Sequence, residues 1–170
     1  MGFTGSAGPS TVINATNDTS ATTHYPVFVA SAGSNQTARV RTTSTALSYI
    51  PSTGKLTSTI LGLSTNTDLI TASATTTATT QTAIASWSTT TYGGGKVVVE
   101  AISGGNRHIT ELIVTHNGTV AIATEYGSLW TGSSLASYEV DISGGNVRIL
   151  ATPASATSTS FKVMQLLMLA

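Results

Sequence analysis

The chain has 170 residues, of which 40% are hydrophobic and 8% charged, and its formal net charge is zero. The neutral balance and the lack of any basic cluster exclude the electrostatic footprint of a nucleic-acid-binding protein. The absence of cysteine excludes disulfide frameworks and thiolate chemistry, and no segment reaches the ~20 apolar residues of a membrane span. A chain so poor in charge must hide much of its apolar surface, and self-association is one way to do so.

The first segment, residues 1–13, is rich in glycine. Gly2, Gly5 and Gly8 recur at every third position, which is the period of collagen, where only glycine fits the axis of three chains. Three triplets are too few to hold a triple helix, and a flexible lead-in explains the spacing equally well. We interpret this segment as a docking tail.

Residues 14–62 are predicted to form a β shaft module. Threonine is frequent here and is favoured on half-buried pleated surfaces, and residues 51–54 form a turn that ends in glycine. A module of this size with so few apolar residues would be marginal alone, which favours strands intertwined from several chains. The predicted strands are Tyr25–Val29, Ala38–Thr42, Leu47–Ile50 and Lys55–Leu61.

Residues 63–83 are predicted to form a connector rich in serine and threonine, with a weak strand at 68–70. From residue 84 to 170 the character changes to short strands with frequent turn signals, which predicts a compact β-sandwich of jelly-roll type. No helical period is present, so the predicted fold class is all-β. The strands expected around the central hairpin are Lys96–Ile102, Ala136–Ile142, Val147–Ala151 and Phe161–Leu169.

The strongest local signal is a hairpin centred on Asn117-Gly118, because a type I′ turn needs positive φ at both central residues. A two-residue turn places Ile113 opposite Ile122, and we assign that face, with Ile109, to the core.

The opposite face of this hairpin carries Leu112 and Val114, so it needs a second sheet or a neighbouring subunit as cover. The last strand is apolar on both faces, which is typical of a strand buried on both sides. We therefore predict Leu112, Val114, Leu166 and Met168 as subunit-interface residues.

Two turns share one sequence, because Ile-Ser-Gly-Gly-Asn occurs at 102–106 and again at 142–146. We expect them at the same rim of the sandwich. Trp130 lies in a glycine-bounded segment, where it either covers one end of the sandwich or stacks on a ligand. Trp130, Asn106 and Asn146 are therefore the candidate surface-binding residues.

Catalytic and metal sites find little support. His108 and His116 share one face of a strand but stand about 26 Å apart at strand rise, and Glu111 points to the other face. Glu139 and Asp141 are about 7 Å apart on one strand face, a spacing that inverting glycosidases use, yet a solvated strand face explains them as well. We expect no enzyme, no metal and no cofactor.

The sequence also predicts a carboxylate near His108. In the predicted register Glu125 lies diagonally across from it, and such a pair would favour the charged form of the imidazole. An ordinary cross-strand contact is the simpler interpretation.

Several of these segments resemble one family. Gly2–Gly8 resembles the Gly-Phe-Thr-Gly-Ser repeats of tail-fibre and other virion structural proteins of phages that infect cyanobacteria. His24–Val29 with Leu47–Leu56 is similar to a shaft module of such fibres. The C-terminal part is similar to a fibre-tip domain, through Thr124–Gly127 and Leu150–Ala154.

This resemblance implies a homotrimer on the phage particle, with little or no catalysis. The expected role is attachment to the host surface, through a glycan or a protein, while the N-terminal tail docks on another virion protein. The alternative is a capsid or baseplate decoration protein without a receptor. An enzyme acting on polysaccharide is a third hypothesis, which rests on Glu139 and Asp141 alone.

Overall fold

The computed structural model describes residues 19, 20, 22–29, 38–40, 42 and 47–170. Every regular element in this part of the chain is a β-strand, which confirms the predicted all-β class. Within the same residues no helix is long and apolar enough to cross a membrane. The predicted docking tail, residues 1–13, lies outside the described residues.

The chain divides into two compact units, Met1–Thr59 and Ile60–Ala170. In unit 1, β1 (Val27–Val29) pairs with β2 (Ala38–Val40), and β3 (Ser48–Ile50) pairs with β4 (Lys55–Thr57), both antiparallel. An isolated bridge joins His24 to Tyr49 through two backbone hydrogen bonds of 2.7 and 2.8 Å. The predicted strands of the shaft module are thus present in shorter form.

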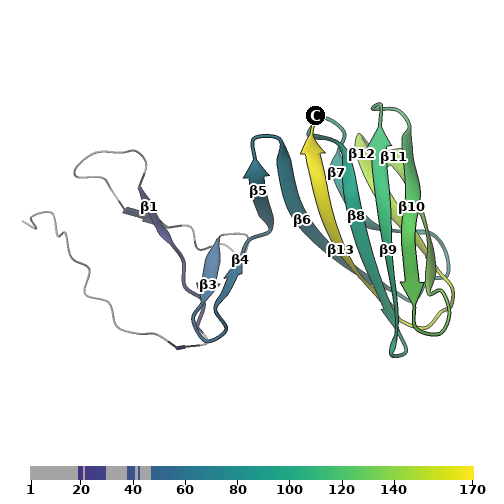
Figure 1. Ribbon diagram of the computed structural model, residues 1–170, viewed down its shortest axis with the longest axis horizontal. Coiled ribbons are helices and arrows are strands. Elements are labelled where there is room, and N and C mark those ends of the chain that lie inside the picture. The colour runs from purple at the N-terminus through teal and green to yellow at the C-terminus, as the bar shows by residue number, and fades with distance from the viewer. Residues whose placement is uncertain (1–18, 21, 30–37, 41, 43–46) are drawn as a thin grey trace, which may run out of the picture. The chain divides into compact units, whose positions relative to one another are not determined.

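Unit 2 is a sandwich of two antiparallel sheets (Figure 1). The large sheet has the order β10-β9-β8-β13-β6-β5, and the small sheet has the order β11-β12-β7. The strands of the large sheet are β5 (Ile60–Ser64), β6 (Thr67–Thr76), β8 (Tyr92–Ser103), β9 (Asn106–His116), β10 (Ala121–Trp130) and β13 (Thr159–Leu169). Those of the small sheet are β7 (Thr82–Ser88), β11 (Ala136–Ser143) and β12 (Asn146–Pro153).

The core lies between the two sheets and follows from alternation along each strand. On β8, Val97, Val99 and Ala101 are fully buried while the residues between them point to the other face. Burial of these apolar side chains is the main stabilising contribution to unit 2. The other core side chains include Leu112, Val114, Trp87, Val147, Ile149, Phe161, Val163 and Leu167.

The last strand, β13, lies inside the large sheet, where it pairs with β6 on one side and β8 on the other. Its inward residues Phe161, Val163 and Leu167 are buried, whereas Met164 and Met168 are exposed on the outward face. The prediction that both faces of this strand are buried holds within the chain for one face only, since the outward residues are exposed.

The segment predicted as a connector belongs to the sandwich instead. β5 and β6 extend over most of it and pair with each other, and β6 also pairs along its whole length with β13. The weak strand expected at 68–70 is the first part of β6. The boundary between the units falls between Thr59 and Ile60, because the predicted strand at 55–61 is interrupted there.

The face assignment of the central hairpin was wrong. Ile109 and Ile113, predicted in the core, are 46% and 48% exposed, whereas Leu112 and Val114 are each 2% exposed beneath the small sheet. The partner of Ile113 is Thr124, two residues beyond the predicted Ile122, because the turn spans four residues in place of two. The cover for Leu112 and Val114 is a sheet of the same chain, so they do not form a subunit interface.

The repeated Ile-Ser-Gly-Gly-Asn turns lie at opposite ends of the sandwich, so the expectation of a shared rim was also wrong. Each is a two-residue hairpin turn with positive φ at both glycines, Gly104 and Gly105 in the first. The second lies beside the β7–β8 loop, where the Thr89 N–H donates to the Gly145 carbonyl over 3.0 Å. We call the end with Gly104 the turn end, and the other the loop end.

The glycine triplet Gly93–Gly95 at the start of β8 has a steric role. An added Cβ at Gly95 would lie 2.1 Å from the Leu166 carbonyl oxygen. Close approach of β8 to β13 therefore requires glycine at this position.

We predict that Gly95→Ala destabilises unit 2 by about 3 kcal/mol, the upper end of the usual range for overpacking. Gly93→Ala is the matched control, because its nearest contact would be Ala170 at an ordinary 3.9 Å. Denaturant unfolding followed by circular dichroism measures both variants. Equal stability of the two would contradict the steric role of Gly95.

Candidate functional site

The candidate site lies at the turn end of unit 2, where the β8–β9 turn meets the last residues of β10. The Thr131 N–H donates to the Arg107 carbonyl over 2.9 Å, and the Arg107 N–H donates to the Thr131 hydroxyl over 3.0 Å. Asn106 lies next to this pair, with its side-chain oxygen 3.3 Å from the position of a Cβ on Gly132. These contacts hold the predicted residues Asn106 and Trp130 at one end of the sandwich.

Trp130 is half exposed, at 49%. Its indole stands edge-on to the buried His108 ring, with centroids 5.4 Å apart and an interplanar angle of 83°, an arrangement that aromatic rings favour. A hollow of about 240 Å³ lies beside it, lined by Glu100, Arg107, Ile109, Leu129, Trp130 and Thr131. The hollow is below the usual range for whole-ligand pockets, so it suits a single ring or small group.

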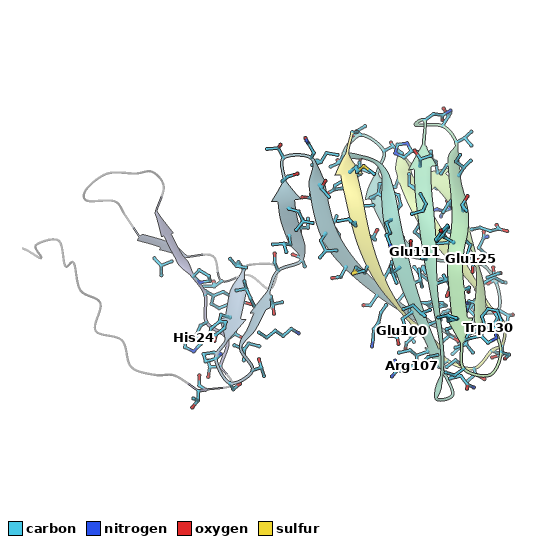
Figure 2. All side chains as sticks on the ribbon, in the orientation of Figure 1. His24, Glu100, Arg107, Glu111, Glu125 and Trp130 are labelled. Atoms are coloured by element: carbon cyan, nitrogen blue, oxygen red, sulfur yellow. The ribbon has the colours of Figure 1, made fainter. Side chains whose placement is uncertain are left out.

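A charge cluster forms the polar side of this hollow. The Arg107 guanidinium donates to the Glu100 carboxylate, and the Lys162 ammonium lies 3.5 Å from the same carboxylate. Arg107 chiefly, with a smaller contribution from Lys162, holds the pKa of Glu100 below its usual value. Figure 2 shows Glu100, Arg107 and Trp130 near the same end of the sandwich. Trp130 pairs with the buried His108, so its indole points to the inner face of the sheet, whereas Glu100 and Arg107 point to the opposite side; all three residues line the hollow at the sheet end.

Beneath Trp130, His108 is 1% exposed and fully engaged. Its Nδ1 accepts from the Leu135 N–H over 3.4 Å, so the proton lies on Nε2, which is 2.7 Å from the Ser128 hydroxyl. Burial lowers the pKa of His108, and the nearby Glu125 carboxylate offsets part of this effect. Glu125 therefore acts in the expected direction, towards the charged imidazole, but burial has the larger effect and the pKa of His108 is lowered overall.

Glu125 instead accepts a hydrogen bond of 2.8 Å from Thr110, whose hydroxyl also lies 3.1 Å from the Gly127 carbonyl. Thr110 is buried and Glu125 is exposed. On β11, burial chiefly and Glu125 secondarily raise the pKa of Tyr138. The two hydrogen bonds of Thr110 tie β9 to β10 at the bulge in β10.

The two carboxylates considered for glycoside hydrolysis are each held by another side chain. Arg148 donates to Asp141 through both Nε, over 2.8 Å, and Nη2. Arg148 thereby holds the pKa of Asp141 below its usual value. Glu139 accepts a 2.7 Å hydrogen bond from the Gln81 amide. A general acid requires a raised pKa, so Asp141 is not suited to that role.

The residues considered for metal binding are far from one another. Glu111 forms an ion pair of 2.6 Å with Lys96 on the exposed face of the large sheet, whereas His108 is buried on the opposite face. His116 lies at the loop end, where its Nε2 donates to the Tyr92 carbonyl over 2.7 Å and its Nδ1 accepts from Gly118. Across the described part of the chain, no group of His, Cys, Asp and Glu could hold a metal ion.

The third candidate residue, Asn146, lies at the loop end and not with the other two. Its side-chain amide donates to the Gly144 carbonyl over 3.2 Å, so it supports the β11–β12 turn. The sequence therefore predicted two of the three residues at one end and missed Arg107 and Glu100. The Gly-Gly turn was the signal that would have found them, since it fixes the register that places Arg107 opposite Ile102.

Comparisons with known proteins add little to this geometry. No protein-family model matches the sequence, and no curated protein matches it. A solved structure with some similarity is the tailspike protein of Acinetobacter phage vB_ApiP_P1, at 20% sequence identity and a TM-score of 0.39. The match covers 70% of this chain and 27% of that chain, so this chain spans about a quarter of the tailspike. A likeness this slight carries no argument about function.

We predict that unit 2 loses stability as the pH falls through the range near 6.5, the ordinary pKa of histidine. The folded state holds the pKa of His108 below that value. Between the two pKa values the unfolded chain therefore binds the extra proton, and stability rises with pH.

Thermal unfolding at pH 5 and pH 7.5 measures this effect. In His108→Gln the pH dependence over this range should shrink, whatever the change in absolute stability. His116→Gln serves as the control, because His116 lies at the opposite end. If the unfolding temperature of His108→Gln changes with pH as much as that of the wild type, other groups cause the pH dependence.

Proposed function

We propose that this chain is a virion structural protein of a bacteriophage that forms a homotrimeric fibre or knob and attaches the particle to the host surface. The virion assignment is supported by the sequence resemblance of Gly2–Gly8 and of the shaft segments to phage fibre proteins. The all-β architecture of the described residues is consistent with it. The proposed location is the particle surface.

The observation that carries the attachment role is the half-exposed Trp130, which lines a hollow at the turn end together with Glu100 and Arg107. An exposed tryptophan that is held rigidly from below by His108 offers a stacking surface at low entropic cost. The charged pair supplies directional hydrogen bonds to hydroxyl groups. We therefore propose a glycan of the host surface as the ligand of the turn end.

We also propose that unit 2 has a jelly-roll topology. The last strand returns to lie between β6 and β8, a crossover of the Greek-key kind from which jelly rolls are built. Unit 1 would continue as an intertwined β shaft, with residues 1–13 docking on another virion protein. Three weak sites on one axis would then gain avidity through their high effective concentration.

We predict that the purified chain is a trimer in solution, with a mass near three times 17.3 kDa. Light scattering coupled to gel filtration measures this mass over a range of concentrations. A folded monomer would contradict the fibre proposal and leave a small decoration or binding module.

We predict that Trp130→Ala weakens glycan binding about tenfold per site, or about 1.4 kcal/mol, because the stacking surface is removed. An array of bacterial lipopolysaccharides and capsular polysaccharides is the probe. Tyr126→Ala is the control, since Tyr126 is 79% exposed on the same strand but lies at its bulge. A trimer that binds no glycan of the array in any form would favour the decoration protein over the attachment protein.

A further inference from the structure

The face of the large sheet that points away from the small sheet carries large apolar side chains in the open. We call it the outer face. Backbone pairing sets Ile113, Lys96 and Leu166 in one row across β9, β8 and β13. The apolar side chains that define the face are 37–74% exposed, and they are Ile109, Ile113, Leu129, Met164, Leu166 and Met168.

The corresponding face of the small sheet has the opposite character. Its outward residues include Ser86, Ser137, Glu139, Asp141 and Arg148, and Arg148 forms an ion pair with Asp141. A sandwich with one solvated face normally shows polar residues there. The small sheet follows this rule and the large sheet does not, so the apolar outer face is a specific feature of the large sheet and not a general property of this composition.

Both acidic side chains within the outer face already have cationic partners, and the three cations and two carboxylates leave one net positive charge. Lys96 and Glu111 form a pair of 2.6 Å, and Glu100 is held by both Arg107 and Lys162. Covering a charge that has lost its partner would be costly. Because both acidic residues keep their partners on the same face, an apolar surface can cover the sheet without leaving either of them unpaired.

The shape and the area of the outer face are also suited to a protein partner. Shallow hollows of about 410 Å³, beside Met164, and 470 Å³, beside Ile109, lie between its side-chain ridges. Methionine adapts to the shape of a partner. Five strands of about ten residues cover roughly 800 Å², from a spacing of about 4.8 Å and a rise of about 3.3 Å, which equals about one side of a standard interface.

We propose that the outer face of the large sheet is a homo-oligomeric interface, in which it packs against a second copy of this chain. An apolar face with internally paired charges is chemically complementary to itself, and sheets pack face to face through such surfaces. The assignment replaces Leu112 and Val114 with Ile113 and Met164 and retains Leu166 and Met168. The interface does not depend on the proposed trimer: one face packed on its own copy gives a pair, whereas three copies would have to bring their outer faces together around a threefold axis.

The test uses the full chain with Ile113→Asp and Met164→Asp, measured by sedimentation over a range of concentrations. Both sites are about half exposed, so each variant is expected to fold, and circular dichroism checks this. A carboxylate buried at the interface should raise the dissociation constant at least a hundredfold. Ser86→Asp is the matched control, because it adds the same charge beside Arg148 on the outward face of the small sheet and should assemble as the wild type does.

A second measurement needs no substitution. Met164 and Met168 are 46% and 61% exposed in the single chain, so hydrogen peroxide should oxidise them rapidly unless a copy covers them. Mass spectrometry of the assembled protein should show both oxidised at least tenfold more slowly than in denaturant.

Two outcomes overturn the interface. One is a wild-type chain that stays monomeric at high concentration, and the other is a wild-type oligomer that both outer-face variants leave intact. A trimer that survives both variants would uphold the proposed trimeric state while removing this interface. A dimer dissolved by Ile113→Asp would support this interface and contradict the trimer.

Discussion

The pairing of β13 on both sides is the constraint on which the rest of unit 2 depends. This strand joins β6 to β8, so without it the large sheet would separate into two pieces. Close approach on the β8 side requires glycine at Gly95. Because alternate residues of a strand point to opposite faces, the burial of Phe161 and Val163 in the core fixes Met164 and Leu166 on the outside. The exposed apolar face is therefore a direct consequence of how the core is built.

Most of the strands were predictable because short alternating runs between glycine-rich turns are local signals. The limits of β11 and β12 were found within a few residues, as the Gly-Gly turn between them needs positive φ at both positions. The strand β6 was largely missed, because its Ser/Thr/Ala sequence carries almost no apolar contrast and depends on pairing with β13. Such long-range pairing has no signal within the segment itself.

The face of the central hairpin was the error with the largest consequence. Both sides of β9 carry apolar side chains, with Ile109 and Ile113 on one and Leu112 and Val114 on the other. Alternation chooses a core face only when the opposite side is polar. The sequence predicted that both sides need cover, but nothing in it indicates which side is covered by the same chain. At the candidate site, Arg107 and Glu100 were missed because the register of the β8–β9 hairpin, which makes them diagonal neighbours, was not worked out from its Gly-Gly turn.

The two surfaces proposed as functional adjoin at the turn end of the sandwich. The outer face extends along the strands of the large sheet, and its residues Ile109 and Leu129 also line the hollow beside Trp130, where the strands finish. A copy packed on the outer face must therefore stop short of this end for the hollow to stay open. The Glu100 cluster is the point of contact between them, since Arg107 lines the hollow beside Trp130 while Lys162 lies on the outer face. In an oligomer built through the outer face, covering Lys162 would strengthen its attraction to Glu100 by excluding water. Assembly would thereby steady the charged side of the hollow, which links oligomerisation to the binding surface through a single carboxylate.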